Sequence, residues 1–471
     1  MKKTVSLLLS ALMLSITVGS MVGTMASCGN QEKDYPVEEG ATEITIYKHD
    51  QTDWENEFFE ASVRKYNENL NDGVQIVYQL IPEANYNDKI KSMREAGKAP
   101  EIFEISYGNM FASEIDFAAS KILPLDDYLS DEAKNDLTDF ARELVTFNGK
   151  IYGVPKVLEA SMLLFYNKDM LQQAGASVPT TWTEMYDTCQ KLESVVNQYQ
   201  RVLGTPLGTA MGWATWGLFY NATGERAIAD DWKSSNVYKN KESYKKFLEY
   251  YTGLYSNGWA TTSDTSGGYN EIIYQICENK MAMTFAGSYA VSQIATTYPE
   301  MMDKIGVTYA PTENGGYETP TSAVGGWAYV VDATAATKTL KDGTSVAQAA
   351  VDFLDWMTRD IELMKAYYKT AYYSKYSGFK SVQAALDEDE DALESPFYEV
   401  IKNVSDHAIA PACYSYSITT AHQTMVESIF FETSTIDEAI KECDKKVEDY
   451  IDVNGYRNVT GTKNPKASEN Q

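Results

Sequence analysis

Three short apolar strands separated by two amphipathic helices open the body of this sequence, between residues 42 and 106. Apolar residues at strand spacing predict three strands, at Ile44 and Ile46, at Val74–Leu80 and at Ile102–Ile105. Apolar residues at helical spacing predict the intervening helices, one through Phe59, Val63, Tyr66 and Leu70 and one at Tyr86–Glu95. This order predicts an α/β fold, an open sheet with substantial parallel pairing and helices on its faces.

The ends of these predicted strands are the first place to expect a ligand. In open α/β sheets, ligands bind beyond the carboxyl ends of the strands. The two segments that follow the first and third strands are Lys48–Asp53 and Ser106–Asn109. We therefore expect polar and aromatic side chains of these segments to meet a solute.

The first 27 residues have the form of a processing signal. Lys2 and Lys3 precede the apolar stretch Val5–Val22, and small residues then lead to Cys28. A bacterial lipoprotein signal requires that thiol, so Cys28 is predicted to be the lipidated first residue of the mature protein. An uncleaved transmembrane helix is the alternative, but the apolar run is short for a span. Residues 28–41 then read as a flexible tether.

Length, charge and cysteine spacing limit the number of domains, the class of partner and the state of the cysteines. The 471 residues exceed one ordinary core and allow two domains. A net charge of −27 argues against a nucleic-acid partner, because phosphates require Lys and Arg. The later cysteines are widely spaced and favour buried free thiols over disulfides, namely Cys189, Cys277, Cys413 and Cys443.

Motifs of enzymes are missing from the sequence. It contains no GxSxG, HExxH, GxGxxG or phosphate-binding loop motif. Asp387, Asp389 and Asp391 alternate like a calcium loop, but Ala392 and Tyr398 occupy its required Gly and Glu positions. We expect no metal, no cofactor and no catalytic residue. A pair of carboxylates that hydrolyses a glycoside remains an open alternative.

Aromatic residues stand out in stretches rich in Gly, Ser and Thr. They are Trp213, Trp216, Trp259, Trp327, Tyr414 and Tyr416. Sugar rings have apolar faces and a rim of hydroxyls, so their sites combine flat aromatic side chains with carboxylates and amides. Core packing is the competing explanation for each of these residues.

Later helices are predicted from capping residues and apolar spacing. Thr181 with Glu184, and Thr435 with Glu438, form capping-box patterns that begin helices. Two sets of apolar residues recur at helical spacing, Val346, Ala350, Phe353 and Met357 in one and Ile436, Ile440, Cys443 and Val447 in the other.

A stretch of some forty residues resembles a known family. It runs from Asn148-Gly-Lys-Ile-Tyr-Gly-Val-Pro155 through Phe165-Tyr-Asn-Lys-Asp-Met170 to Thr181-Trp-Thr-Glu184. It is similar to the central signature of the family 1 extracellular solute-binding proteins, the receptors of carbohydrate ABC importers. Further similar segments follow in the family's order, at Pro100–Phe103, Leu123–Leu125, Glu278–Met283, Gly287–Tyr289 and Gly325–Trp327. The resemblance covers nearly all of residues 42–452.

The resemblance implies a two-lobed fold of the type II periplasmic-binding-protein kind. Each lobe would be a mixed, mostly parallel sheet flanked by helices, with three hinge crossings near Val157–Ser161, Thr308–Pro311 and Ala333–Thr337. The N-lobe would comprise residues 42–157 and 309–335, and the C-lobe residues 158–308 and 336–453. Residues 454–471 would form a disordered tail.

The resemblance also implies a ligand-binding set. The expected contacts are Tyr47, His49, Gln51, Tyr107, Asn109, Glu159, Trp213, Trp216, Tyr289, Trp327, Tyr414 and Tyr416. Glu159 follows Pro155 by four residues, where the maltodextrin receptor of the family has a sugar-binding glutamate. Tyr289 stands where many relatives have a stacking Trp.

The function implied is capture of a mono- or oligosaccharide between the lobes by hinge closure, and delivery to ABC permease subunits. We expect a monomer on the extracytoplasmic side of the cell membrane, held by lipid alone, in a bacterium without an outer membrane. A surface glycoside hydrolase and a solute sensor for a signalling partner are the alternatives.

Overall fold

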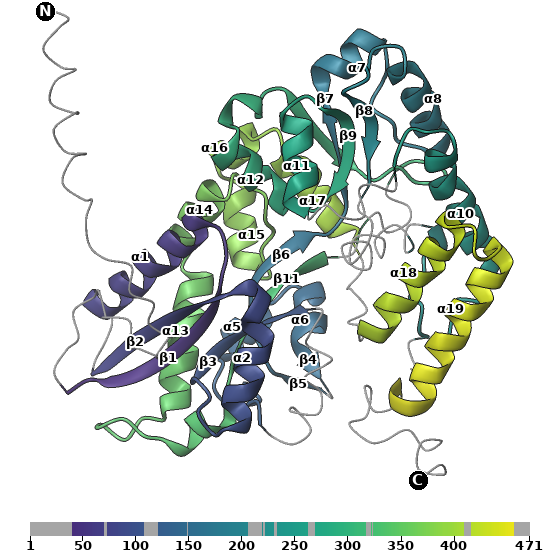
Figure 1. Cartoon of the computed structure of the whole chain (residues 1–471). Coiled ribbons are helices and arrows are strands. Elements are labelled where there is room, and N and C mark those ends of the chain that lie inside the picture. The colour runs from purple at the N-terminus through teal and green to yellow at the C-terminus, as the bar shows by residue number, and fades with distance from the viewer. Residues whose placement is uncertain are drawn as a thin grey trace, which may run out of the picture. The chain divides into compact units, whose positions relative to one another are not determined.

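Five strands form the first sheet, in the order β2-β1-β3-β11-β6 (Figure 1). The computed structural model describes residues 40–69, 73–107, 121–147, 149–205, 219, 222–229, 233–261, 269–316, 322, 324–408 and 416–455. The strands are β1 (Thr42–Asp50), β2 (Val74–Pro82), β3 (Ile102–Ser106), β6 (Val154–Ala160) and β11 (Val324–Val331). They belong to one compact unit, residues 42–471.

The predicted strand–helix–strand order at the start of the chain is confirmed. Helix α1 (Asp53–Asn69) connects β1 to β2, and α2 (Glu83–Glu95) connects β2 to β3. β1 pairs in parallel with both β2 and β3, as crossover helices of this kind require. Ile44, Ile46 and Ile102 are fully buried between the layers.

The second sheet has the order β10-β7-β9-β8. Its strands are β7 (Leu163–Asn167), β8 (Arg201–Gly204), β9 (Met281–Ala286) and β10 (Ile305–Tyr309). Alternate side chains enter different cores on its two faces, since Leu164 joins one cluster while Leu163 and Phe165 join another. The second sheet thus packs on cores at both faces, and helices flank both sheets, as predicted.

Pairing is mixed in both sheets, and less parallel than predicted. β11 runs antiparallel to β3 and to β6 in the first sheet, and β7 runs antiparallel to β9 and to β10 in the second. Within the described part of the chain, β8 with β9 is the one parallel pairing of the second sheet. The reason is that the chain passes from β6 in the first sheet to β7 in the second, and later from β10 in the second sheet to β11 in the first. The strands that follow these passages enter their sheets without the crossover helix that a parallel neighbour in the same sheet would need.

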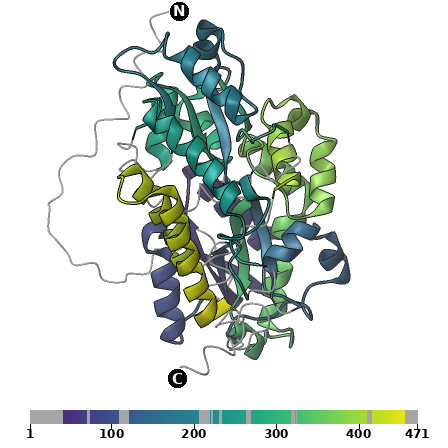
Figure 2. The same cartoon turned by 90° about the vertical axis from the view of Figure 1, so that its right-hand side faces the viewer.

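The second lobe is built mainly from helices around its sheet. They are α7 (Lys168–Ala174), α8 (Trp182–Leu192), α10 (Lys241–Ser256), α11 (Tyr269–Cys277), α12 (Tyr289–Thr297), α17 (Tyr398–Asp406), α18 (Tyr416–Phe430) and α19 (Ile436–Tyr450). Helices α18 and α19 pack against each other and against α10. They form the yellow C-terminal segment, which Figure 2 shows after a quarter turn. Both predicted capping boxes are present, at Thr181 for α8 and Thr435 for α19.

Four helices that were predicted to lie in the C-lobe belong to the first core. They are α13 (Val346–Arg359), α14 (Ile361–Thr370), α15 (Lys380–Asp387) and α16 (Glu390–Glu394). The buried face of α13, including Val346, Ala350 and Phe353, packs in the same cluster as β1 and β3, because α13 lies against β6 and β11 (Figure 1). The assignment of all of residues 336–453 to the C-lobe was therefore wrong for this stretch.

The crossings between the sheets differ accordingly. The first falls between Ala160 at the end of β6 and Leu163 at the start of β7, beside its predicted place. The second falls between Tyr309 and Val324, which overlaps the predicted Thr308–Pro311 without containing Thr308, a residue of β10. The third does not occur at Ala333–Thr337, since Ala335 and Leu340 are still in the first core. The chain joins the second lobe's core near Phe397.

The smaller elements complete the first lobe. Helices α5 (Asp131–Asp136) and α6 (Asp139–Val145) lead into a two-stranded sheet of β4 (Thr146–Phe147) and β5 (Lys150–Ile151). Among the described residues, no helix is long and apolar enough to cross a membrane. Cys189, Cys277 and Cys443 are buried free thiols, as predicted. Cys28, Cys413, most of the predicted tether and residues 456–471 lie outside the described residues.

Candidate functional site

The ends of four strands meet at one edge of the first sheet. The register pairs Tyr47 with Phe103, so β1 and β3 end at the same level. Glu159, near the end of β6, pairs with Gly325, near the start of β11. Side chains from His49, Gln51, Glu159 and Trp327 are thereby brought to the carboxyl-end edge, where the sequence predicted a ligand.

A bulge in β11 sets the position of Trp327. The pairing of β6 with β11 shifts between Trp327 and Ala328. Gly326 just before it has a φ of 121°, and a Cβ there would lie 2.2 Å from the carbonyl oxygen of Val157 and 3.0 Å from the ring of Tyr107. Only glycine fits, and bulges of this kind redirect the following side chain.

The ring of Trp327 stacks on His49. The ring centroids are 3.7 Å apart and the planes are inclined by 20°. Trp327 is half-buried, whereas His49 is almost fully enclosed. The stack therefore leaves part of the indole accessible while the imidazole fixes the ring from behind.

Glu104 holds His49 from the interior of the sheet. Its Oε2 accepts a hydrogen bond from the backbone N–H of His49 at 3.0 Å and also contacts the ring Nδ1. Burial lowers the pKa of His49 despite the opposing effect of this carboxylate. The contact places the ring proton of neutral His49 on Nδ1, toward Glu104.

Lys156 connects Glu104 to Gln51. Its Nζ donates to Glu104 Oε1 at 2.9 Å and to Gln51 Oε1 at 2.6 Å, and it lies 3.7 Å from Glu55 Oε1. Burial would raise the pKa values of Glu104 and Glu55, but Lys156 and neighbouring cations outweigh it. The pKa of Glu55 falls to about 2 and that of Glu104 lies well below its usual range. Both glutamates are therefore ionised in the folded protein.

Glu159 is paired with a lysine that is distant in sequence. Lys375 Nζ contacts Glu159 Oε1, and the lysine is almost completely buried. Tyr372 and Tyr373 precede it with φ values of 53° and 55°, a left-handed conformation that is rare outside glycine. The backbone of Tyr376 then pairs with Leu158 of β6, with N···O distances of 2.8 and 2.9 Å. This strained turn carries the ammonium to the end of β6.

Tyr289 lies beside the same strand end. The backbone N–H of Ser288 donates to the carbonyl oxygen of Ala160 at 2.8 Å. A Cβ on Gly287 would lie 2.6 Å from the Tyr289 ring and 3.2 Å from that carbonyl oxygen. The half-buried Tyr289 is thus a neighbour of the end of β6.

The other predicted contacts are placed differently. Tyr107 is fully buried, with its ring against Gly326, so it supports the edge from within. Lys89 Nζ of α2 lies 5.9 Å from the centroid of the Tyr47 ring, so this ring packs toward α2. The remaining positions, Asn109, Trp213, Trp216, Tyr414 and the side chain of Tyr416, lie outside the described residues. Trp259 is buried, and its indole N–H donates to Glu193 at 2.6 Å, so this residue belongs to the core.

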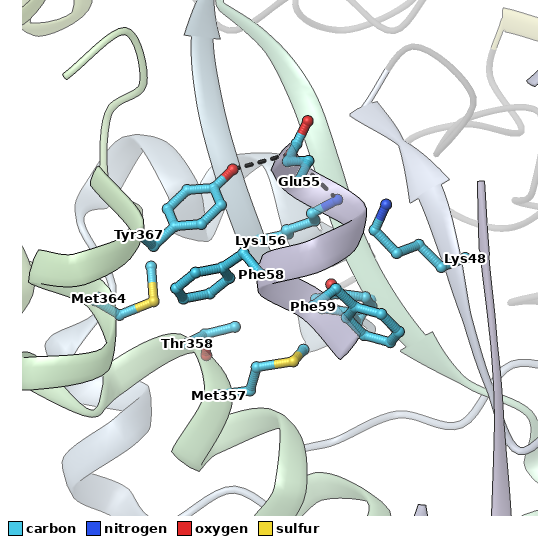
Figure 3. A pocket seen from close by; sticks show the side chains of 10 residues that line it. Lys48, Glu55, Phe58, Phe59, Lys156, Met357, Thr358, Met364 and Tyr367 are labelled. Atoms are coloured by element: carbon cyan, nitrogen blue, oxygen red, sulfur yellow. Dashed lines mark hydrogen bonds and ion pairs between the residues drawn. The ribbon is translucent and has the colours of Figure 1, made fainter. Parts of the chain in front are cut away.

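A small cavity lies behind the edge, among β1, β6, α1, α13 and α14 (Figure 3). Figure 3 shows Lys48, Glu55 and Lys156 at its polar end. The Tyr367 hydroxyl donates to Glu55 Oε1 at 3.0 Å. Apolar side chains form the other walls, including Phe58, Phe59, Met357 and Met364. Its volume of about 30 Å³ suits water and not a sugar ring. The carboxyl-end edge and this cavity are therefore separate features that share Lys156.

The sequence profile of the bacterial extracellular solute-binding proteins matches residues 49–362. That is well over half of the 471 residues. The chain belongs to this family. The resemblance stated from the sequence is thereby confirmed.

Curated relatives of this solute-binding protein match over part of their length. A mannitol-binding protein of Pseudomonas aeruginosa is 26% identical over 215 residues, 45% of this chain and 48% of the relative. An uncharacterized ABC transporter extracellular-binding protein of Pyrococcus horikoshii is 23% identical over 295 residues, 60% of this chain and 63% of the relative. The match therefore spans less than two thirds of either relative.

Solved structures show the same fold. A receptor of Streptomyces glaucescens, solved unliganded and with acarbose, has a TM-score of 0.70 at 19% identity, covering 86% of this chain and 98% of that one. A cyclic α-maltosyl-1,6-maltose binding protein of Arthrobacter globiformis has a TM-score of 0.68 at 20% identity, covering 88% and 99%. The predicted two-lobed α/β fold class is confirmed by this likeness and by the two sheets.

Sequence reasoning missed the charged residues of this solute-binding protein's interior. Glu104 and Lys156 lie in the buried, mainly apolar strands β3 and β6, which was a usable signal, because a charge in a buried strand needs a partner. Glu55 and Lys375 carried no comparable signal. Among the described residues, no group of three or more His, Cys, Asp or Glu could hold a metal ion.

Proposed function

We propose that this chain is the extracytoplasmic receptor of an ABC importer and that it binds a sugar or oligosaccharide without chemically changing it. The observation that carries the proposal is the composition of the carboxyl-end edge. An indole backed by a stacked imidazole, an amide and a carboxylate stand there on β11, after β1 and on β6, as Trp327, Gln51 and Glu159.

These groups suit a carbohydrate. The accessible part of the Trp327 indole offers an apolar face for the C–H side of a sugar ring. Gln51 and Glu159 offer a donor and an acceptor for hydroxyls, and each is already held by a buried lysine. A solute without hydroxyls would leave these polar groups desolvated and unpaired, which costs binding free energy.

The relatives support the same class of solute. They include proteins named for mannitol and for maltodextrin, and solved structures with acarbose and raffinose. All of these solutes carry many hydroxyl groups. We infer that the solute here does so too, and that the predicted aromatic residues of the second lobe complete the site.

The hydrolase alternative is disfavoured by the charge state of the buried carboxylates. A glycosidase needs one carboxylic acid that keeps its proton near neutral pH, which requires a raised pKa. Around the described edge, the pKa values of Glu55 and Glu104 are shifted downward. These downward shifts disfavour both as the general acid, and the other described glutamate of the edge, Glu159, is paired with Lys375.

The proposal includes the anchor and the partner. Lipidation of Cys28 would keep the receptor at the outer face of the cell membrane, close to its permease subunits, as a monomer. This arrangement suits a cell without an outer membrane to confine a free receptor.

Isothermal calorimetry of the purified chain against mannitol, monosaccharides and linear and cyclic oligosaccharides tests the proposal. We expect at least one of these to bind, and incubation with it to leave it uncleaved. Binding of a peptide or a polyamine in place of every sugar would overturn the solute class. Turnover that is lost on changing a single carboxylate would overturn the receptor.

A further inference from the structure

Glu104 is a buried carboxylate whose two oxygens serve different neighbours. The side chain is 1% exposed in the middle of β3, between apolar Phe103 and Ile105. Oε2 faces His49, through both its backbone N–H and its ring Nδ1. Oε1 accepts from Lys156 at 2.9 Å. Glu104 itself does not reach the accessible edge.

The Lys156 branch ends at Gln51. The ammonium donates to the amide oxygen of Gln51 at 2.6 Å, so that oxygen is oriented inward. The Gln51 N–H₂ group must then point away from Lys156, because the two ends of a planar amide are opposite. The branch therefore fixes the orientation of the Gln51 amide, with N–H₂ as the end that Lys156 does not hold.

The His49 branch ends at Trp327. A carboxylate at Nδ1 fixes both the proton position and the rotation of the imidazole about its side chain. Trp327 follows the Gly326 bulge and stacks on that ring, with the two ring centroids 3.7 Å apart and the planes inclined by 20°. The orientation of the imidazole thus sets the orientation of the indole.

Stability of the fold does not by itself explain such a residue. A buried ion network often contributes no more to stability than apolar side chains of the same volume, because desolvation of the charges is costly. A network whose members orient surface groups has a further role, in which preorganised contacts lose less entropy on binding.

We propose that Glu104 is a positioning residue that sets two solute contacts at once, the Gln51 amide through Lys156 and the Trp327 indole through His49. Its predicted effect on solute affinity rests on the proposed function. Its predicted effect on the orientation of Gln51, His49 and Trp327 does not. One carboxylate couples a hydrogen-bonding group and a stacking group that come from different strands.

The first test needs no solute. Ring ¹⁵N and ¹³C NMR of the full chain reports the His49 tautomer, and the difference in emission between each protein and its Trp327→Phe counterpart reports the indole. We expect Nδ1–H in the native chain and loss of that signature, with a changed Trp327 emission, in Glu104→Gln. Glu101→Gln is the matched control, since Glu101 is a buried glutamate before β3 that accepts from Thr45 N–H at 2.8 Å and from Lys338.

The second test uses the sugar with highest affinity in the calorimetric panel. We expect Glu104→Gln to weaken binding at least tenfold, and Gln51→Ala to add little further loss in that background. His49→Phe keeps an aromatic stack while removing the ring nitrogens, so it should leave the cost of Gln51→Ala intact. If Glu104→Gln does not fold, the sugar affinity of His49→Phe, with and without Gln51→Ala, still tests the His49 branch.

The outcomes separate the two proposals. An unchanged His49 tautomer in Glu104→Gln, or fully additive losses with Gln51→Ala, would overturn the positioning role. Failure of every sugar to bind would contradict the proposed function, while the tautomer and the Trp327 emission would still decide the role of Glu104.

Discussion

At the scale of single residues, buried ionisable groups give the folded protein its clearest dependence on pH. His422 lies in the core of the second lobe, with Nδ1 3.0 Å from the Ile418 carbonyl oxygen and Nε2 3.1 Å from the Tyr244 hydroxyl. Burial lowers its pKa to about 4, against an ordinary value of 6.5. The folded protein therefore keeps this imidazole neutral where the unfolded chain would protonate it.

This shift predicts a loss of stability in mild acid. Between pH 6.5 and about 4 the unfolded state binds more protons at His422, so its contribution falls by up to about 3 kcal/mol as the pH drops. Urea denaturation at pH 7.5 and 4.5 should show a smaller loss in His422→Gln than in the native chain. His407→Gln, at an exposed position, is the control. An equal acid loss in His422→Gln and the native protein would contradict this account.

The pair of Lys375 and Glu159 predicts a large cost when one partner is removed. Lys375→Met leaves the Glu159 carboxylate at the end of β6 with its charge uncompensated, which should cost about 3 kcal/mol. Urea denaturation measures this. Lys369→Met removes an exposed pair with Asp391 nearby and should leave the midpoint almost unchanged. Equal midpoints for the two variants would show that the buried pair contributes nothing specific.

Residue-level prediction from the sequence reached the edge but not its interior. The expected position of His49, Gln51 and Trp327 at the carboxyl-end edge followed from strand ends and from an aromatic after two glycines, which are local patterns, and their contact with a solute stays a prediction. Lys375 could not be found in this way, since its partner is 216 residues away and a strained turn brings the two together. Such pairings depend on the three-dimensional path of the chain.

At the scale of elements, the β11 bulge is the feature that shapes the edge most strongly. Gly326 combines a φ of 121° with a contact that no Cβ could occupy, whereas Gly343 has a φ of 91° with nothing within 4 Å. The two glycines share backbone strain and differ in crowding. They form a natural pair for testing the bulge.

Gly326→Ala should therefore destabilise the fold more than Gly343→Ala. Backbone strain costs each variant about 1–2 kcal/mol, and the overlap with Val157 adds a further cost of about 1–3 kcal/mol in Gly326→Ala alone. Urea denaturation gives the difference, and the emission of Trp327 should shift only in Gly326→Ala. Indistinguishable variants would mean that the bulge is not fixed by this close approach.

Elements near one another in sequence were predicted well. The β1-α1-β2-α2-β3 order and the two capping boxes followed from apolar spacing and capping residues, which are local signals. The place of α13 to α16 was not predictable from such signals. Their apolar faces are equally compatible with either sheet, and only the packing of Val346 and Phe353 against the first core decides.

At the scale of the whole molecule, the anchor makes a prediction that does not depend on the solute. If Cys28 carries lipid, Cys28→Ser should move the protein from the membrane fraction to the soluble fraction outside the cytoplasm. Its solute affinity should be unchanged, because residues 42–455 contain the fold. Immunoblots of fractionated cells measure the distribution, and a variant that stays with membranes would contradict lipid anchoring.

The family, the fold and the edge together lead to one central claim, that a carbohydrate binds at the carboxyl-end edge of the first sheet. The most direct measurement is a calorimetric titration of that sugar into the native chain, Gln51→Ala and Gln348→Ala. Gln348 is a half-buried glutamine of α13 that donates to the carbonyl oxygen of Tyr128 and to Asp352. Neither partner is a residue of the carboxyl-end edge. We predict a roughly tenfold weaker affinity for Gln51→Ala and native affinity for Gln348→Ala, since one hydrogen bond is worth about 1 kcal/mol or more. Native affinity in Gln51→Ala, or equal losses in both variants, would contradict the claim.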